Sequence, residues 1–150
     1  MDKRKWHLVY TKPQKETLAR EHLERQQFRV YLPMNDVIKR IRGVRKKRTE
    51  PFFSRYLFVH LCSETDNWSP IRSTIGVVGL VRFGGVAATI PGEIVELLQQ
   101  REQQIETKDV MQQNFSEGER VRIMDGALAG YEAIFKASRS TDRALLLLDI

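Results

Sequence analysis

The chain has 150 residues, a formal net charge of +6 and an isoelectric point near 9.7, which leaves room for one domain and a small appendage and excludes two large domains. The positive excess makes a polyanion a reasonable partner, and the single cysteine excludes a disulfide framework or a Cys-rich zinc site. No segment resembles a signal peptide or a membrane helix of roughly 18 apolar residues, so we expect a soluble cytoplasmic protein.

The first quarter of the chain predicts a strand, a helix and a second strand. Residues 6–11, WHLVYT, are aromatic and β-branched, which is typical of a strand. Pro13 suits a first helical turn. Residues 14–27 are charged except for a narrow apolar arc, so they predict a helix packed by one face on a sheet. Residues 28–38, FRVYLPMNDVI, predict the next strand.

A strongly basic stretch, residues 39–48, predicts an extended hairpin with Gly43 at its turn, and residues 54–61 predict the strand after it. The seven cationic side chains of the stretch are Lys39, Arg40, Arg42, Arg45, Lys46, Lys47 and Arg48. A narrow arm of this kind suits phosphate backbones. The alternative is a solvated, self-repelling loop, and both interpretations stay open because no aromatic residues are interleaved with the charges.

The remaining elements complete an α+β pattern. Pro70 starts a short predicted helix, residues 76–85 predict a strand that ends at two glycines, and Pro91 starts a helix that continues to residue 105. The order β-α-β-β-α-β-α fits helices on an antiparallel sheet. The polar residues 106–114 predict a linker.

The C-terminal piece, residues 115–150, gives conflicting signals. A turn at Gly126 follows an alternating segment, which predicts a hairpin of a small barrel. The closing residues 143–150, RALLLLDI, favour a helix, because leucine and alanine are good helix formers and the run does not alternate. The tail stays ambiguous between helix and strand.

Enzymatic machinery is not indicated. The sequence has no phosphate-binding loop, no Gly-x-Ser-x-Gly elbow and no His-Glu-x-x-His helix. His7, His22 and His60 are scattered along the chain. We therefore expect no catalysis, no cofactor and no metal site.

Two surfaces invite a binding interpretation. In strand 54–61, Tyr56 and Phe58 share one face, while the aliphatic residues on the other face are enough for a core. The aromatic face is then a candidate protein-binding site, and the alternative is that both faces are buried. In the first helix, His22, Arg25 and Gln26 share a face suited to base contacts, and the alternative is a solvated flank.

Taken in order, these motifs resemble the NusG family of transcription elongation factors, and most of all its specialised RfaH branch. The resemblance covers about residues 6–150, and the segments that carry it are W-x-L-V-Y, EHLERQ, EPFFSRYLFV, IRSTIGVVGLVRFGG and EGERVRIMDGALAGYEAIF. It implies a NusG-type N-terminal domain over residues 1–105, the linker 106–114 and a KOW-related segment over residues 115–150. The last barrel strands of that segment are expected to be lacking.

The resemblance also implies a monomeric transcription antitermination factor that acts without catalysis, cofactor or membrane. The clamp helices of the largest RNA polymerase subunit would be bound by a first group, which we call the aromatic set: Phe53, Tyr56 and Phe58. The gate loop of the second-largest subunit would be contacted by a second group, which we call the loop set: Asn67, Trp68 and Ser69. The exposed non-template DNA strand would be contacted by a third group, which we call the nucleic-acid set: Lys12, His22, Arg25, Gln26, Arg72 and Thr74.

Within this resemblance, the C-terminal segment would form a helical hairpin over the aromatic set until recruitment releases it to become a barrel that binds a ribosome. The closed state would be held by a fourth group, the latch set, in which Glu50 and Arg143 would form an ion pair. The members of the latch set are Glu50, Arg143, Phe135, Leu145 and Leu148. Two alternatives remain: a general NusG-like elongation factor without autoinhibition, and a KOW-type protein that binds RNA or the ribosome mainly through the basic stretch.

Overall fold

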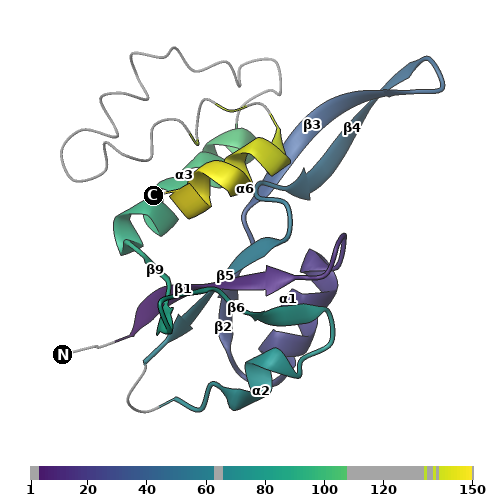
Figure 1. The fold of residues 1–150 in the computed structure, drawn as a ribbon. Helices are drawn as coiled ribbons and strands as arrows, with labels where there is room; N and C mark the ends of the chain where they lie inside the picture. Colours follow the sequence, from purple (N-terminus) through teal and green to yellow (C-terminus); the bar gives the residue numbers. More distant parts are fainter. Residues whose placement is uncertain (1–3, 63–65, 108–133, 135–136, 138, 150) are drawn as a thin grey trace. The chain divides into compact units, whose positions relative to one another are not determined.

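The computed structural model describes residues 4–62, 66–107, 134, 137 and 139–149, with only the backbone for 103–107 and 149. These residues form two compact units, and Figure 1 traces the chain through them. The first unit comprises Met1–Leu32 and Ser54–Val95, and the second comprises Pro33–Phe53 and Glu96–Ile150.

The first unit is built on an antiparallel sheet. Its central strand β1 (Lys5–Thr11) pairs with β5 (Tyr56–Leu61) from Lys5 opposite Leu61 to Tyr10 opposite Tyr56. The strand order is β2 (Arg29–Tyr31), β5, β1 and β6 (Val77–Leu80), and β9 (Thr89–Ile90) also pairs with β1. The other elements are α1 (Glu16–Arg25), α2 (Ser69–Arg72) and the small hairpin of β7 (Arg82–Phe83) and β8 (Val86–Ala87). The predicted α+β class with an antiparallel sheet is confirmed.

The core of this unit uses both faces of β5. Leu57, Phe58 and Val59 are successive residues that point to alternate faces, and each is 0% exposed. On α1, Ala19 and Leu23 are also 0% exposed, which confirms the predicted apolar arc. A strand buried on both faces does not need a polar alternation, which is why β5 carries aromatic residues on one buried face and aliphatic residues on the other.

Helix α1 begins later than Pro13 predicts. Gln14 has a φ of 61°, a left-handed conformation that a right-handed helix cannot contain. The first helical residue is Glu16, whose carboxylate accepts a hydrogen bond from the backbone N–H of Arg55 at 3.0 Å. The helix start is therefore fixed by a contact with a distant turn and not by the proline.

Gly76 allows the turn before β6 to approach α1 closely. Its φ is +86°, and a Cβ at this position would lie 3.1 Å from the backbone N of Ala19 and 3.2 Å from the carbonyl O of Lys15. The Gly76 carbonyl also accepts a hydrogen bond from the backbone N–H of Lys12 at 2.9 Å. Only glycine combines this backbone conformation with this approach.

We predict that Gly76→Ala lowers the free energy of unfolding by about 2–4 kcal/mol, the sum of left-handed backbone strain and displacement of helix backbone. Gly85→Ala is the matched control, because Gly85 has a φ of +80° and no heavy atom within 4 Å of the position that a Cβ would occupy. That control should cost only about 1 kcal/mol. Urea unfolding of both variants measures the difference, and equal losses would contradict a steric role for Ala19.

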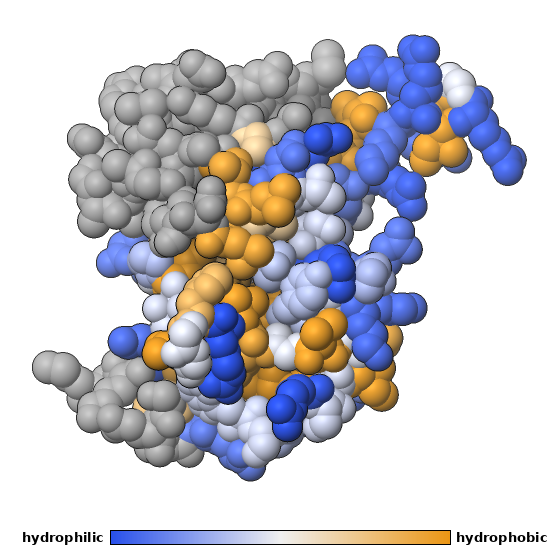
Figure 2. Space-filling view, viewed as in Figure 1, coloured by the Kyte–Doolittle hydropathy of each residue, from blue (hydrophilic) through white to orange (hydrophobic). Residues whose placement is uncertain are grey.

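The second unit contains a long β-hairpin and parts of two helices. Strands β3 (Met34–Ile41) and β4 (Val44–Pro51) pair in continuous register, and Arg42 and Gly43 both have positive φ at the turn. This confirms the predicted hairpin, which we call the arm. Most of α3 (Gly92–Thr107) and all of α6 (Ser140–Asp149) belong to the same unit. Figure 2 shows the arm as mainly hydrophilic.

Two predicted strands are wrong in extent. Residues 28–38 form two strands, β2 and β3, because the chain leaves the first unit after Leu32 and Pro33 has no N–H to donate to a ladder. The predicted strand 76–85 is likewise split into β6 and β7, which belong to different sheets. Helix α3 runs to Thr107, two residues beyond its predicted end, and the rest of the predicted linker lies outside the described residues.

The base of the arm is anchored by α3. The Arg101 guanidinium donates to the Asn35 side-chain carbonyl at 2.6 Å and lies 4.6 Å from the centre of the Phe52 ring. The Glu102 carboxylate accepts a hydrogen bond from the backbone N–H of Met34. Charged hydrogen bonds of this kind each stabilise by roughly 1.5–3 kcal/mol. The arm therefore projects from a fixed base.

Candidate functional site

The aromatic set is divided between the two units and is buried in both. Phe53 belongs to the second unit, is 1% exposed and packs edge-on against Phe52 with ring centres 5.0 Å apart. Tyr56 and Phe58 belong to the first unit, where they are 8% and 0% exposed. The alternative of two buried faces, left open by the sequence, is what the structure has.

Within the first unit, Tyr56 and Phe58 each have an aromatic neighbour. The Tyr56 ring lies 5.1 Å from that of Tyr10 on β1, and the Phe58 ring stacks on that of Tyr31 on β2 at 6.3 Å. Burial raises the pKa of the Tyr56 hydroxyl, so this group stays protonated well above neutral pH. The rings therefore form a neutral apolar layer across three neighbouring strands.

Arg55 organises the turn before β5, a role for which no sequence pattern provides a signal. The residue has a φ of 70°, which is unusual for a side chain of this size. Its guanidinium donates to the Thr11 carbonyl at 3.0 Å and lies 4.2 Å from the centre of the Tyr10 ring, while its backbone N–H bonds Glu16. Arg55 thus fixes the position at which Tyr56 enters the sheet.

The loop set surrounds the start of α2. The Asn67 side-chain carbonyl accepts hydrogen bonds from the Ser69 backbone N–H at 3.1 Å and the Ser69 hydroxyl at 2.7 Å, and both residues are exposed. Trp68 is half-buried, and its indole N–H donates to the Cys62 carbonyl at 3.3 Å. The loop set therefore presents polar groups beside an anchored indole.

His7 packs against the Trp68 indole. The two rings meet edge to face at 4.7 Å, and His7 is 4% exposed. Burial is the main cause that lowers the pKa of His7, and nearby Lys5 acts in the same direction. The imidazole is therefore neutral at physiological pH, as its buried position requires.

Part of the nucleic-acid set is brought together at the C-terminal end of α1. The Gln26 side-chain amide donates to the Thr74 hydroxyl at 2.8 Å and to the His22 carbonyl at 3.1 Å. Lys12 precedes the other end of α1, where its backbone N–H donates to the Gly76 carbonyl. Lys12, Arg25 and Arg72 are exposed, His22 is half-buried and Thr74 is 6% exposed. The set therefore combines three exposed cations with an amide whose position is fixed by Thr74.

We predict that Thr74→Val lowers the free energy of unfolding by about 1–2 kcal/mol, because the buried Thr74 hydroxyl also donates to the Pro70 carbonyl at 2.8 Å. Its replacement removes this bond and the bond from Gln26, both of which are partly buried. The matched control is Ser73→Ala, whose exposed hydroxyl donates to the same carbonyl at 3.1 Å. That control should change stability by less than about 0.5 kcal/mol. Similar losses in chemical denaturation would argue against Thr74 as an anchor.

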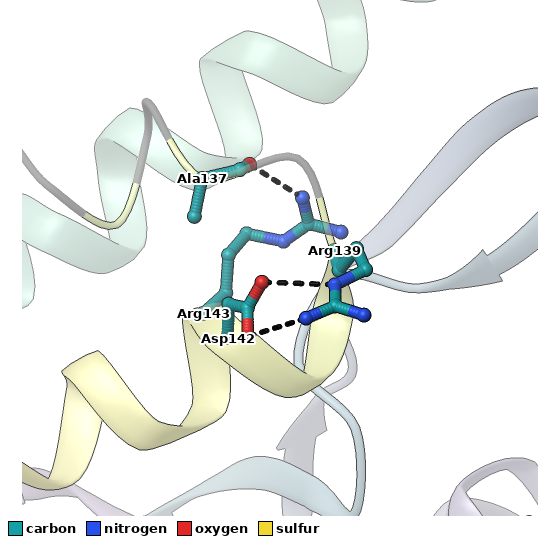
Figure 3. Close-up of polar contacts among 4 residues, drawn as sticks. All are labelled: Ala137, Arg139, Asp142 and Arg143. Atoms are coloured by element: carbon teal, nitrogen blue, oxygen red, sulfur yellow. Dashed lines mark hydrogen bonds and ion pairs between the residues drawn. The ribbon is translucent and has the colours of Figure 1, made fainter.

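The latch set gathers around Phe52 only in part, and Figure 3 shows the bond of its member Arg143 to the Ala137 carbonyl. Arg143 on α6 is 3% exposed, donates through Nε to the Phe52 carbonyl at 2.6 Å and through Nη1 to the Ala137 carbonyl at 2.9 Å. Its guanidinium also lies 4.2 Å from the centre of the Phe52 ring. Burial lowers the pKa of Arg143, and the charge of Glu50 opposes this shift. Glu50 itself forms an ion pair with Lys39 at 2.9 Å.

The leucines of the latch set are not fully buried, as a role in covering the aromatic set would require. Leu145 is 68% exposed and Leu148 is half-buried, whereas the buried residues of α6 are Arg143, Ala144 and Leu147. Phe135 lies outside the described residues. The run of four leucines therefore has an exposed side, because a helix turns successive residues through about 100°.

The described part of the chain holds neither a metal-binding cluster nor a membrane-spanning helix. Within it, no group of three or more His, Cys, Asp and Glu side chains is placed to hold a metal ion. Among the helices described there, none is long and apolar enough to cross a membrane.

A family comparison matches most of the described chain. Residues 4–99 match the model of the family described as transcription termination factor nusG. The protein named transcription termination/antitermination protein NusG from Escherichia coli strain K12 is 27% identical over 144 residues, which cover 88% of this chain and 78% of that protein. The protein of the same name from Yersinia pestis is 30% identical over 108 residues, which cover 70% and 59%.

A more distant relative carries the same name. The NusG protein of Halalkalibacterium halodurans is 25% identical over 139 residues, covering 84% of this chain and 77% of that protein. A solved structure titled "Domain interaction in Thermotoga maritima NusG" superposes with a TM-score of 0.48 at 22% identity, covering 65% of this chain and 59% of that one.

Proposed function

Because the chain belongs to the NusG family of transcription termination and antitermination factors, we propose that it binds RNA polymerase and the exposed non-template DNA strand and suppresses pausing and termination. The polymerase contacts are the clamp helices, through the aromatic set, and the gate loop, through the loop set. Both sides of the DNA cleft would then be bridged, which holds the clamp closed without covalent chemistry.

The observation that carries this proposal is the arrangement around Gln26. Its amide is held by Thr74, and the exposed cations Lys12, Arg25 and Arg72 belong to the same unit. Amide and guanidinium groups make bidentate hydrogen bonds to base edges, and cations neutralise phosphates. The Gln26 Nε2 donates to both His22 and Thr74, so the amide offers its fixed oxygen to a base while the guanidinium groups supply the bidentate donors. The group is therefore suited to reading a displaced strand.

We also propose that the chain has a closed state of the RfaH type. The support is that residues 140–149 form a helix and not a strand, and that this helix buries Arg143 against the Phe52 carbonyl, next to Phe53 of the aromatic set. Release of this contact would make Phe53 available to polymerase. A KOW-like refolding of the released segment and its binding to a ribosome complete the proposal.

The test is transcription in vitro by purified RNA polymerase, with pausing and read-through scored with and without the protein. We expect read-through to increase on templates that contain a particular pause element and not on templates that lack it. Gln26→Ala should abolish this dependence on template sequence, whereas Gln27→Ala, an exposed neighbour outside the nucleic-acid set, should not. Absence of any effect on every template would reject the proposed function.

A general NusG-like factor without autoinhibition is the second candidate, and the names of the relatives favour it. This candidate predicts that the protein binds polymerase equally well on all templates. It also predicts that weakening the Arg143 contact leaves the affinity for polymerase unchanged. Binding of the full chain to core polymerase without a DNA element therefore separates the two candidates.

A further inference from the structure

The outer part of the arm carries positive charge that the described chain does not neutralise. Of its seven cations, Lys39 pairs with Glu50 at 2.9 Å and Lys47 pairs with Asp36 at 3.2 Å. Both carboxylates lie toward the base of the arm. The cations that form no ion pair within the described residues are all exposed and are Arg40, Arg42, Arg45, Lys46 and Arg48.

The pairing of the arm sets like charges opposite each other. Lys39 lies directly opposite Lys46, and Arg40 lies directly opposite Arg45. Directly opposed like charges destabilise an antiparallel pair. Because successive residues of a strand point to opposite faces, one of these pairs lies on each face of the arm. A hairpin with only a structural role would gain stability from a carboxylate in either pair, so a ligand that neutralises both faces is indicated.

We infer that the outer arm, residues 38–48, is a binding site for double-stranded DNA that does not depend on base sequence. Four of its five unpaired cations are arginines, whose planar guanidinium groups match phosphate oxygens in a bidentate way. A two-stranded ribbon is also narrow enough to enter a major groove of about 12 Å. The two charged faces of the ribbon would then meet the two phosphate backbones that border the groove.

The composition of the arm favours a duplex over other nucleic acids. Residues 34–51 contain no aromatic side chain, whereas proteins that bind single strands stack bases on aromatic rings. The one amide of the arm, Asn35, is at its base and is bonded to Arg101, so the outer arm offers cations for phosphate contacts, which carry no sequence information. Duplex RNA is a poorer fit, because its major groove is too deep and narrow for side chains.

This site shares no residue with the nucleic-acid set. The arm belongs to the second unit, and Lys12, Gln26 and Thr74 belong to the first. The inference does not depend on the proposed function, because duplex binding by the arm requires neither polymerase nor a displaced strand. A factor with both sites would contact single-stranded and double-stranded DNA through different residues.

The test is fluorescence anisotropy of the full chain with a labelled duplex of about 25 base pairs and arbitrary sequence, between about 50 and 200 mM NaCl. The variant is Arg40→Gln combined with Arg45→Gln. The matched control is Lys5→Gln combined with Arg82→Gln, which removes the same charge from exposed positions outside the arm. We expect the arm variant to lose at least tenfold in affinity and to reduce the salt slope by about 1.8, since each phosphate contact contributes about 0.9.

The control variant should keep the wild-type affinity and salt slope. Thermal unfolding checks the fold, and the arm variant should unfold at the same temperature as the wild type or higher, because it removes a repulsive pair. A second arm variant, Lys46→Gln with Arg48→Gln, should reproduce the loss. Unchanged duplex binding in both arm variants would overturn the inference. Equal losses in the control, or equal affinity for a single strand or for polyglutamate, would overturn it too.

Discussion

Replacing Arg143 by alanine should reduce the protection of the α6 amides against hydrogen exchange by about 30- to 1000-fold, equivalent to ~2–4 kcal/mol. The guanidinium makes two hydrogen bonds, to the Phe52 and Ala137 carbonyls, and hydrogen bonds from a charged donor contribute about 1.5–3 kcal/mol each. Burial of the charge offsets part of this gain, and Nη2 is buried with no hydrogen-bond partner among the described residues. The net loss is therefore smaller than the sum of the bonds.

Arg139→Ala is the matched control, because Arg139 lies one turn earlier and is exposed. It donates to the Asp142 carboxylate at 3.0 Å with a side chain that is 75% exposed. Surface ion pairs contribute little to stability, so its removal should leave the protection of α6 nearly unchanged. If the two variants behaved alike, the buried contacts of Arg143 could not be what holds this helix.

The same variant tests the proposed closed state. If α6 restricts access to the aromatic set, the Arg143→Ala variant should bind core polymerase more tightly than the wild type does. The increase in affinity can be as large as the decrease in hydrogen-exchange protection of the α6 amides. Arg139→Ala should bind like the wild type. Equal polymerase affinities for all three proteins, together with a loss of protection in Arg143→Ala, would reject autoinhibition and keep the structural role of Arg143.

Phe58→Leu should weaken polymerase binding by about 30-fold or more in the Arg143→Ala background. Aromatic residues at the centre of an interface often contribute 2 kcal/mol or more to binding, and leucine removes the ring that stacks on Tyr31. Leucine keeps an apolar side chain at the position, and hydrophobic swaps that nearly conserve volume cost less than about 1.5 kcal/mol of stability, so we expect a loss of about this size. Biolayer interferometry on immobilised core polymerase measures the affinity, and urea unfolding measures the stability.

The control for Phe58 is Val59→Ala on the same strand. Val59 is also 0% exposed but points to the opposite face of β5. Two buried methyl groups at ~0.8 kcal/mol each give it a loss of stability of about 1.5–2 kcal/mol, close to that of Phe58→Leu. If Val59→Ala weakened polymerase binding as strongly as Phe58→Leu, lost stability would explain both effects and the aromatic set would lose its support.

Local signals predict much of the fold and fail where distant contacts decide. The arm is predictable because Gly43 follows a basic strand and precedes another, and the apolar arc of α1 is predictable because its period is helical. The start of α1 is not predictable, since Glu16 is held by the distant Arg55. The break at Pro33 within FRVYLPMNDVI is not predictable either. The residues on both sides of it have high β-propensity, although the chain passes there from one unit to the other.

The candidate site shows the same division. The spacing of His22, Arg25 and Gln26 is local, so a shared helix face could be predicted, and the bond of Gln26 to Thr74 joins it to a second segment of the predicted set. The burial of Phe58 could not be decided, because period-two alternation says which residues share a face and not whether that face is covered. The contacts of Arg55 join it to residues 10–16, a segment far away in sequence, which no local pattern records.

The anchored base of the arm has a consequence for the order of events during synthesis. The bond between Asn35 and Arg101 joins positions 66 residues apart, and the contact of Arg143 with Phe52 spans 91. At about 5–20 residues per second, a ribosome needs roughly 3–13 s to add 66 residues. An isolated hairpin is at best marginally stable in water. The nascent arm is therefore not stabilised until its anchoring residues have been synthesised. A chain released before Arg101 would carry the positive charges of the arm on a hairpin that lacks its stabilising contacts.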